Sequence, residues 1–190
     1  MKIMYLVPIV IVLFFIGCSN ESNINSPIED NLDGWEVVTR STNEEGLQVN
    51  TIFSVSKVIN GDQGGFLFTG NIFETKSGKT GCVFGSLTFL AGSFSGTKTI
   101  SMSLDNKKLL GTFGPSMSFN KPASFSVLYA GVNLSNNEQS DFKFVYWAPN
   151  GMQYEIPYTY LYFDKAKGVL GILNAQIPHF SRYVFVKRSL

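Results

Sequence analysis

The sequence predicts an all-β protein, a single β-sandwich that follows a lipoprotein signal peptide and a short flexible tether. From Gly34 onward apolar and polar residues alternate with a period of two, and no convincing stretch with a helical period appears. Eighteen glycines interrupt these runs, and turn signals roughly every 8–12 residues are typical of sandwiches and barrels. The total of 190 residues is the length of one domain. We therefore expect a signal peptide at 1–17, a lipidated cysteine with its tether at 18–33, and one sandwich at 34–190.

The first residues have the features of a bacterial lipoprotein leader. Lys2 supplies a positive charge, and Ile3 to Ile16 is an almost wholly apolar run of 14 residues. A permanent membrane span needs about 18 or more apolar residues, whereas a secretory leader needs fewer. The run ends at Gly17-Cys18, which resembles a lipobox, in which a small residue precedes the cysteine that receives lipid. We expect cleavage after Gly17 and attachment of diacylglyceryl and palmitate-type acyl chains to Cys18.

The segment after Cys18 reads as a spacer between membrane and domain. Ser19 to Pro27 is polar and contains almost no apolar residue, as flexible tethers do. Ser19, in place of an aspartate directly after the cysteine, indicates by resemblance export to an outer membrane. The expected location is the cell envelope, with the membrane contacted through the N-terminal lipid.

Strand positions follow from the alternation and from the turn residues. Thr99 to Leu104 alternates hydroxyl and apolar side chains, as a strand half-buried on one face of a sandwich requires. Phe66, Phe68 and Ile72 share one parity, and Asn60-Gly61 has turn chemistry. We expect strands at 34–40, 47–59, 64–74, 82–90, 97–104, 109–119, 122–130, 141–147, 152–163, 168–176 and 181–188.

Charge and cysteine content limit the classes of partner. Fifteen basic and 14 acidic side chains nearly balance and are scattered along the chain, so no basic stripe for nucleic acid is present. Apart from Cys18 the chain has one cysteine, Cys82. A solitary exposed thiol is a liability in an oxidising compartment, so we expect Cys82 to be packed inside.

A catalytic role receives little support from the residues. His179 is the only histidine, which excludes a metal site of several imidazoles, and a triad would need partners that the sequence does not place. Asp141, Glu155 and Asp164 lie in or near late strands, and a carboxylate-dependent glycan hydrolase is a remote alternative. We expect no enzyme activity, no metal and no cofactor.

The most suggestive surface feature is a group of aromatic residues near the Pro149-Asn150-Gly151 turn. Even-numbered tyrosines between 154 and 162 would share one face of a single strand, and such a row can stack on sugar rings or anchor a protein. Core packing explains the same pattern. The candidate binding residues are Trp147, Tyr154, Tyr158, Tyr160 and Tyr162.

Several segments together resemble ZU5 domains. These are Gly64-Gly65, Leu87 to Met102, Pro115 to Ala123 and His179 to Tyr183, the last resembling the ending of bacterial extracellular relatives. The resemblance implies a ZU5-like β-sandwich that binds proteins, as in ankyrins and netrin receptors, and catalyses nothing. The expected function is a lipid-anchored, non-catalytic interaction module of the cell envelope. The alternative is a carbohydrate-binding surface lipoprotein that uses its tyrosine face.

Overall fold

The computed structural model describes residues 34–40, 52–74 and 80–189. The predicted signal peptide, Cys18 and the tether lie outside these residues. No helix within the described ranges is long and apolar enough to cross a membrane.

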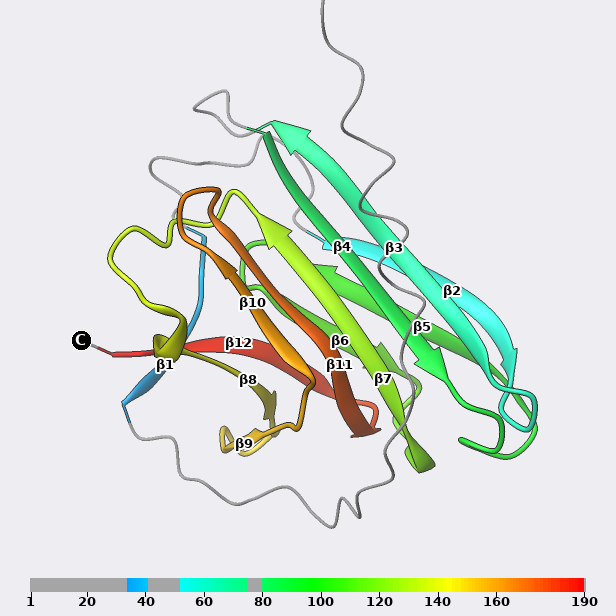
Figure 1. Ribbon diagram of the computed structural model, residues 1–190. Coiled ribbons are helices and arrows are strands. Elements are labelled where there is room, and N and C mark those ends of the chain that lie inside the picture. Colours follow the sequence, from blue (N-terminus) through cyan, green and yellow to red (C-terminus); the bar gives the residue numbers. More distant parts are fainter. Residues whose placement is uncertain (1–33, 41–51, 75–79, 190) are drawn as a thin grey trace, which may run out of the picture.

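The protein is all-β, with two antiparallel sheets packed against each other (Figure 1). One sheet has seven strands in the order β2-β5-β6-β12-β8-β9, with β1 also pairing with β12, and the other has five in the order β10-β11-β7-β4-β3. The predicted β-sandwich is therefore confirmed. The strands are β1 Trp35–Val37, β2 Ile52–Asn60, β3 Gly65–Glu74, β4 Thr80–Phe89, β5 Thr97–Asp105, β6 Leu110–Gly114, β7 Ser118–Ala130, β8 Phe142–Trp147, β9 Gln153–Glu155, β10 Tyr160–Asp164, β11 Val169–His179 and β12 Arg182–Arg188.

The inward-facing apolar side chains of the alternating strands fill the space between the sheets. Ile100, Met102 and Leu104 of β5 are fully buried, while the hydroxyl residues between them face outward, as the sequence predicts. Aromatic rings from both sheets complete the core. Phe125 of β7 meets Phe113 of β6 edge to face, with 4.9 Å between ring centroids, a favoured arrangement for aromatic pairs.

Arg40 ties the two sheets together at one end of the sandwich. It is buried, and its Nη2 donates to Asn106 Oδ1 at 2.9 Å, in the turn between β5 and β6 of the seven-stranded sheet. The same nitrogen donates to the carbonyl of Ala130 at 2.8 Å, and Nη1 donates to the carbonyl of Gly131, both at the end of β7. The planar guanidinium suits this role because it presents several donors in a fixed fork.

The predicted single strand at 152–163 is wrong. The structure has two short strands here, β9 in the seven-stranded sheet and β10 in the five-stranded sheet. Pro157 has no N–H to donate to a ladder, and Ile156 just before it turns its side chain into the core. The chain therefore crosses from one sheet to the other between Glu155 and Tyr160.

Proline also shifts a second boundary. The expected strand at 109–119 ends as β6 at Gly114, directly before Pro115, and the next strand, β7, already begins at Ser118. The strand expected at 168–176 extends to His179. Residues 47–51 of the strand expected at 47–59 lie outside the described residues.

Candidate functional site

The outer face of the five-stranded sheet carries a group of exposed hydrophobic side chains. Alternation in β3 turns Leu67 and Phe73 inward, so the residues of opposite parity point away from the core. The same holds for β10, where Leu161 is buried. The large exposed side chains on this face are between 38% and 62% exposed, and they are Phe66, Phe68, Ile72, Tyr160 and Tyr162.

A glycine accommodates one of the central rings of this face. Gly70 of β3 lies opposite Phe84 of β4, and a β-carbon at Gly70 would come within 2.2 Å of the Phe84 ring. Phe84 therefore lies over the glycine, as aromatic residues do across a strand pair. Its ring is stacked against Phe68 with 6.0 Å between centroids and 13° between planes. The rings of β3 and β4 thus form one continuous surface.

A band of uncharged polar side chains crosses the same face beside these rings. We call it the polar band, and the register places its members in two adjacent rows. Phe68 pairs with Ser86 and Ser86 with Ser126, while Phe66 pairs with Thr88 and Thr88 with Ser124. The polar band consists of Ser86 and Thr88 of β4, Ser124 and Ser126 of β7, and Asn174 and Gln176 of β11.

A β-bulge in β11 turns Asn174 toward solvent. The register with β7 shifts between Ile172 and Ala175, and Asn174 has a φ of 53°, a region that asparagine tolerates better than most residues. The Asn174 backbone N–H donates to Ser126 Oγ at 3.0 Å, and Ser124 Oγ donates to Asn174 Oδ1 at 3.2 Å. The two serines therefore hold the bulge, since their hydroxyls replace part of the interrupted ladder.

The structure does not bring the five predicted binding residues into one site. Tyr160 and Tyr162 lie together on the outer face of β10, with 6.5 Å between ring centroids. Tyr154 belongs to β9 in the other sheet and is half-buried, stacked on Tyr146 at 5.7 Å. The shared strand face expected for these tyrosines does not exist, because the strand is broken at Pro157.

Trp147 and Tyr158 occupy two further places. Trp147 lies on the seven-stranded sheet, where the Arg182 guanidinium stands 5.1 Å from its ring centroid. Tyr158 is in the crossing segment and lines an open hollow of about 420 Å³ together with Phe142 and Leu161. Burial, and then the charge of Glu155, raise the pKa of the Tyr158 hydroxyl. Neither residue contributes to the outer face of β3 and β10.

His179 is packed among tyrosine rings at the end of β11. Its ring lies 4.6 Å from that of Tyr146, edge to face, and the Tyr183 hydroxyl donates to the His179 carbonyl at 2.6 Å. Burial lowers the pKa of the imidazole. The Tyr183 hydroxyl also lies 3.5 Å from His179 Nδ1, so the imidazole is part of the packing between these strands.

The prediction that Cys82 is packed in the core is wrong. Gly81 and Val83 on either side of it are buried, so the thiol lies on the outer face, half-buried opposite Ile72. Burial raises its pKa despite a hydrogen bond from the backbone at Ala130. The prediction failed because parity, set by the neighbouring inward residues, decides the face of a strand residue.

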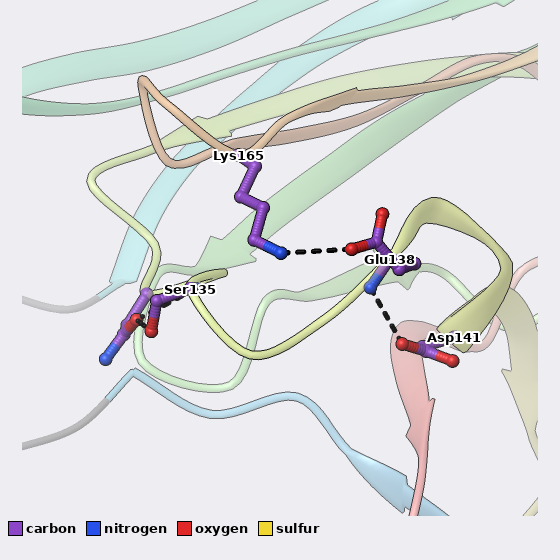
Figure 2. A network of polar contacts seen from close by, with 5 residues as sticks. Ser135, Glu138, Asp141 and Lys165 are labelled. Atoms are coloured by element: carbon purple, nitrogen blue, oxygen red, sulfur yellow. Dashed lines mark hydrogen bonds and ion pairs between the residues drawn. The ribbon is translucent and has the colours of Figure 1, made fainter.

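The three carboxylates considered for hydrolysis each have a local partner. Asp141 Oδ2 accepts the Glu138 backbone N–H at 2.8 Å, which closes the turn before β8 (Figure 2). Glu155 pairs with Lys143 within the seven-stranded sheet. Asp164 accepts the Lys167 backbone N–H at 2.9 Å in the turn after β10.

These acidic residues therefore stabilise turns and strand pairs. Figure 2 also shows Lys165, from the β10–β11 turn, paired with Glu138 at 3.0 Å, so the two connections are linked. Among the described residues, no group of three or more metal-ligating side chains comes together.

Comparisons with known proteins leave the family open. No protein-family model matches the chain, and no curated protein and no solved structure is significantly similar to it. The resemblance to ZU5 domains therefore stays a prediction.

The surface formed by β3 and β4 is not predicted from the sequence. The available signal in the sequence is the shared parity of Phe66, Phe68 and Ile72. Parity alone does not tell which face of a strand is buried. Here Leu67 and Phe73 occupy the core, and this leaves the other three side chains outside.

Proposed function

We propose that the protein is a lipid-anchored, non-catalytic binding module of the cell envelope, and that its recognition surface is the outer face of the five-stranded sheet. The observation that carries the proposal is the group of exposed side chains on that face, Phe66, Phe68, Ile72, Tyr160 and Tyr162. Phe66 and Phe68, with the Phe84 ring stacked on Phe68, form an exposed apolar surface at one edge of the sheet, and such a surface typically marks an interaction site. Aromatic side chains are enriched among the residues that contribute most binding energy.

The absence of catalysis in this proposal is supported by the roles of the acidic residues. Asp141, Glu155 and Asp164 are each engaged in a turn or an ion pair. Glycoside hydrolysis requires two carboxyl groups flanking a shared substrate position, and Glu155 and Asp164 belong to different sheets.

The anchor is supported by the leader sequence. Gly17-Cys18 at the end of a short apolar run predicts a lipidated N-terminus. We expect that Cys18→Ser releases the chain in soluble form or stalls it as precursor, since stable anchoring takes more than one acyl chain. Unchanged partitioning into detergent after leader cleavage would contradict the anchor.

The surface is tested with a double variant of the full chain. Phe66→Ala with Phe68→Ala removes two exposed rings of β3, and retention of the variant on isolated cell envelopes is measured against that of the unmodified chain. Truncating an anchor residue typically costs about 2 kcal/mol or more of binding, so retention should fall at least tenfold.

A matched control is available on the other sheet. Val58 of β2 is 63% exposed, more than either phenylalanine, and Val58→Ala should leave retention unchanged. All variants should melt near the temperature of the unmodified chain, because exposed changes alter stability by only about 0.5 kcal/mol. Equal retention of the double variant and the control would remove the outer face as the recognition surface.

A further inference from the structure

We propose that the polar band and the rings at its two ends form a binding site for an extended, uncharged polysaccharide chain that lies across the strands of the five-stranded sheet. The inference rests on the proposed function, because it names the class of ligand that the outer face takes.

Aromatic rings stand at both ends of the band. Phe66 and Phe68 lie on β3, at one edge of the sheet, and Tyr160 lies on β10, at the opposite edge. Sugar rings have apolar C–H faces that stack on aromatic rings, and exposed tyrosine adds a hydroxyl. Four strand spacings of about 4.8 Å separate β3 from β10, or about 19 Å. One monosaccharide cannot contact both edges, so the ligand is a chain of several units.

The side chains between the rings offer hydrogen bonds of both kinds. The hydroxyls of Ser86 and Thr88 form no hydrogen bond with the described part of the chain, and neither does Asn174 Nδ2. Gln176 uses its Nε2 on the Asn174 carbonyl at 3.1 Å, which leaves Oε1 to accept. Sugar hydroxyls are both donors and acceptors, so this mixture of unused groups complements them.

The charge of the surface restricts the ligand further. None of the side chains of the band is ionisable, and the aromatic residues at β3 are phenylalanines. An anionic glycan would find no cation within the band to offset the loss of its hydration. A neutral polysaccharide meets no such cost, and its binding depends little on salt because no ion pair is formed.

The backbone at Asn174 is irregular, because the register with β7 shifts there. Asn174 has a φ of 53° in the bulge, an uncommon conformation for a residue other than glycine, and the bulge turns its amide onto the outer face. Bulges commonly re-aim side chains at functional positions. The amide of Asn174 therefore lies at the β11 end of the band, between Ser124 and Tyr160, where a bound chain would cross.

Affinity electrophoresis of the purified full chain tests the inference. The gels contain xylan, galactomannan, hydroxyethyl cellulose, laminarin or dextran as neutral probes, and polygalacturonate or dextran sulfate as charged probes. A polyoxyethylene detergent is used because it has no sugar head group. We expect at least one neutral probe to retard the protein and the charged probes to have no effect. The retardation should persist in about 0.5 M salt, because salt screens charged contacts and not uncharged ones.

Three variants test whether the polysaccharide binds on the outer face of the five-stranded sheet. Phe68→Ala and Tyr160→Ala remove one ring at each end, and each should weaken binding about tenfold or more. Asn174→Gly removes the amide while keeping a backbone that glycine adopts readily, so binding falls and the melting temperature does not. Val58→Ala, on the other sheet, should bind as the unmodified chain does.

The outcomes separate this inference from the proposed function. If no neutral probe retards the chain, while envelope retention still depends on Phe66 and Phe68, the polysaccharide site is refuted and the binding module stands. Self-association that is lost in Phe68→Ala would assign the face to a second copy and also overturn the inference. Polysaccharide binding that survives Phe68→Ala, Tyr160→Ala and Asn174→Gly alike would place the site elsewhere and overturn the inference.

Discussion

The imidazole of His179 illustrates how single residues are used in this protein. Its ring packs against Tyr146 at 4.6 Å and lies beside Tyr183, whose hydroxyl is satisfied by the His179 carbonyl. Burial makes the charged form costly and lowers the pKa. Tyr146 of β8 and Tyr183 of β12 therefore pack around a neutral histidine at the end of β11.

This environment predicts a pH dependence of stability. Because the native pKa is below the unfolded value of about 6.5, the unfolded chain takes up a proton first as the pH falls. The stability contributed by neutral His179 is complete above the unfolded pKa and is lost as the pH drops through 6.5 toward the native pKa. We expect the melting temperature of the full chain to fall between about pH 7.5 and about pH 5.5.

The variant His179→Gln provides the control, since His179 is the only histidine of the chain. In this variant the melting temperature should change less over the same interval. An equally steep dependence in His179→Gln would assign the effect to other groups.

At the scale of elements, the pairing of β3 with β4 depends on a glycine. Gly70 leaves room for Phe84 above it, and a β-carbon there would also come within 2.5 Å of the Val83 carbonyl oxygen. Edge strands are normally the weakest part of a sheet. β3 is an edge strand, and Lys57 of β2 donates to its Phe66 carbonyl at 3.0 Å, which covers part of the free edge as lysines commonly do.

Gly70→Ala is therefore expected to destabilise the protein by about 1–3 kcal/mol, the usual cost of forcing extra atoms into a packed position. The measurement is the free energy of unfolding from denaturant titration. Ile72→Ala, two residues along the same strand and exposed, should change that free energy by no more than about 0.5 kcal/mol. A Gly70→Ala chain as stable as Ile72→Ala would show that Phe84 moves aside without cost.

At the scale of the whole molecule, the sheets are held together by the aromatic core and, at one end, by Arg40. Its guanidinium donates to Asn106 on one sheet and to the carbonyls of Ala130 and Gly131 on the other. It also stands 5.4 Å from the centroid of the Phe73 ring. Hydrogen bonds from a buried charged group are stronger than neutral ones, and removing the donor leaves buried carbonyls unsatisfied.

Arg40→Met should lower the free energy of unfolding by about 3 kcal/mol or more, because breaking a buried charged network leaves its partners without hydrogen bonds. Arg40→Lys should recover only part of the loss, since lysine keeps the charge without the planar fork. Arg188→Met is the matched control, because Arg188 is exposed above the Trp35 ring. Equal effects of Arg40→Met and Arg188→Met would contradict a role in joining the sheets.

The sequence by itself determined the all-β class and most strand positions of this protein. Period-two alternation in segments such as Thr99 to Leu104 reflects burial on one side of a sheet, and that burial is a local property of the chain. Turn residues such as Asn60-Gly61 likewise mark strand ends through local backbone preferences.

Only the tertiary structure decided which face of each strand is outside and which strands are neighbours. Cys82 and Phe68 share the outer face because their inward neighbours fill the core, and parity is relative until the core is known. Tyr154 and Tyr160 are close in sequence but lie in different sheets, because Pro157 interrupts the strand. Phe68 and Tyr160 are far apart in sequence yet share one face, since strand order is set by long-range pairing.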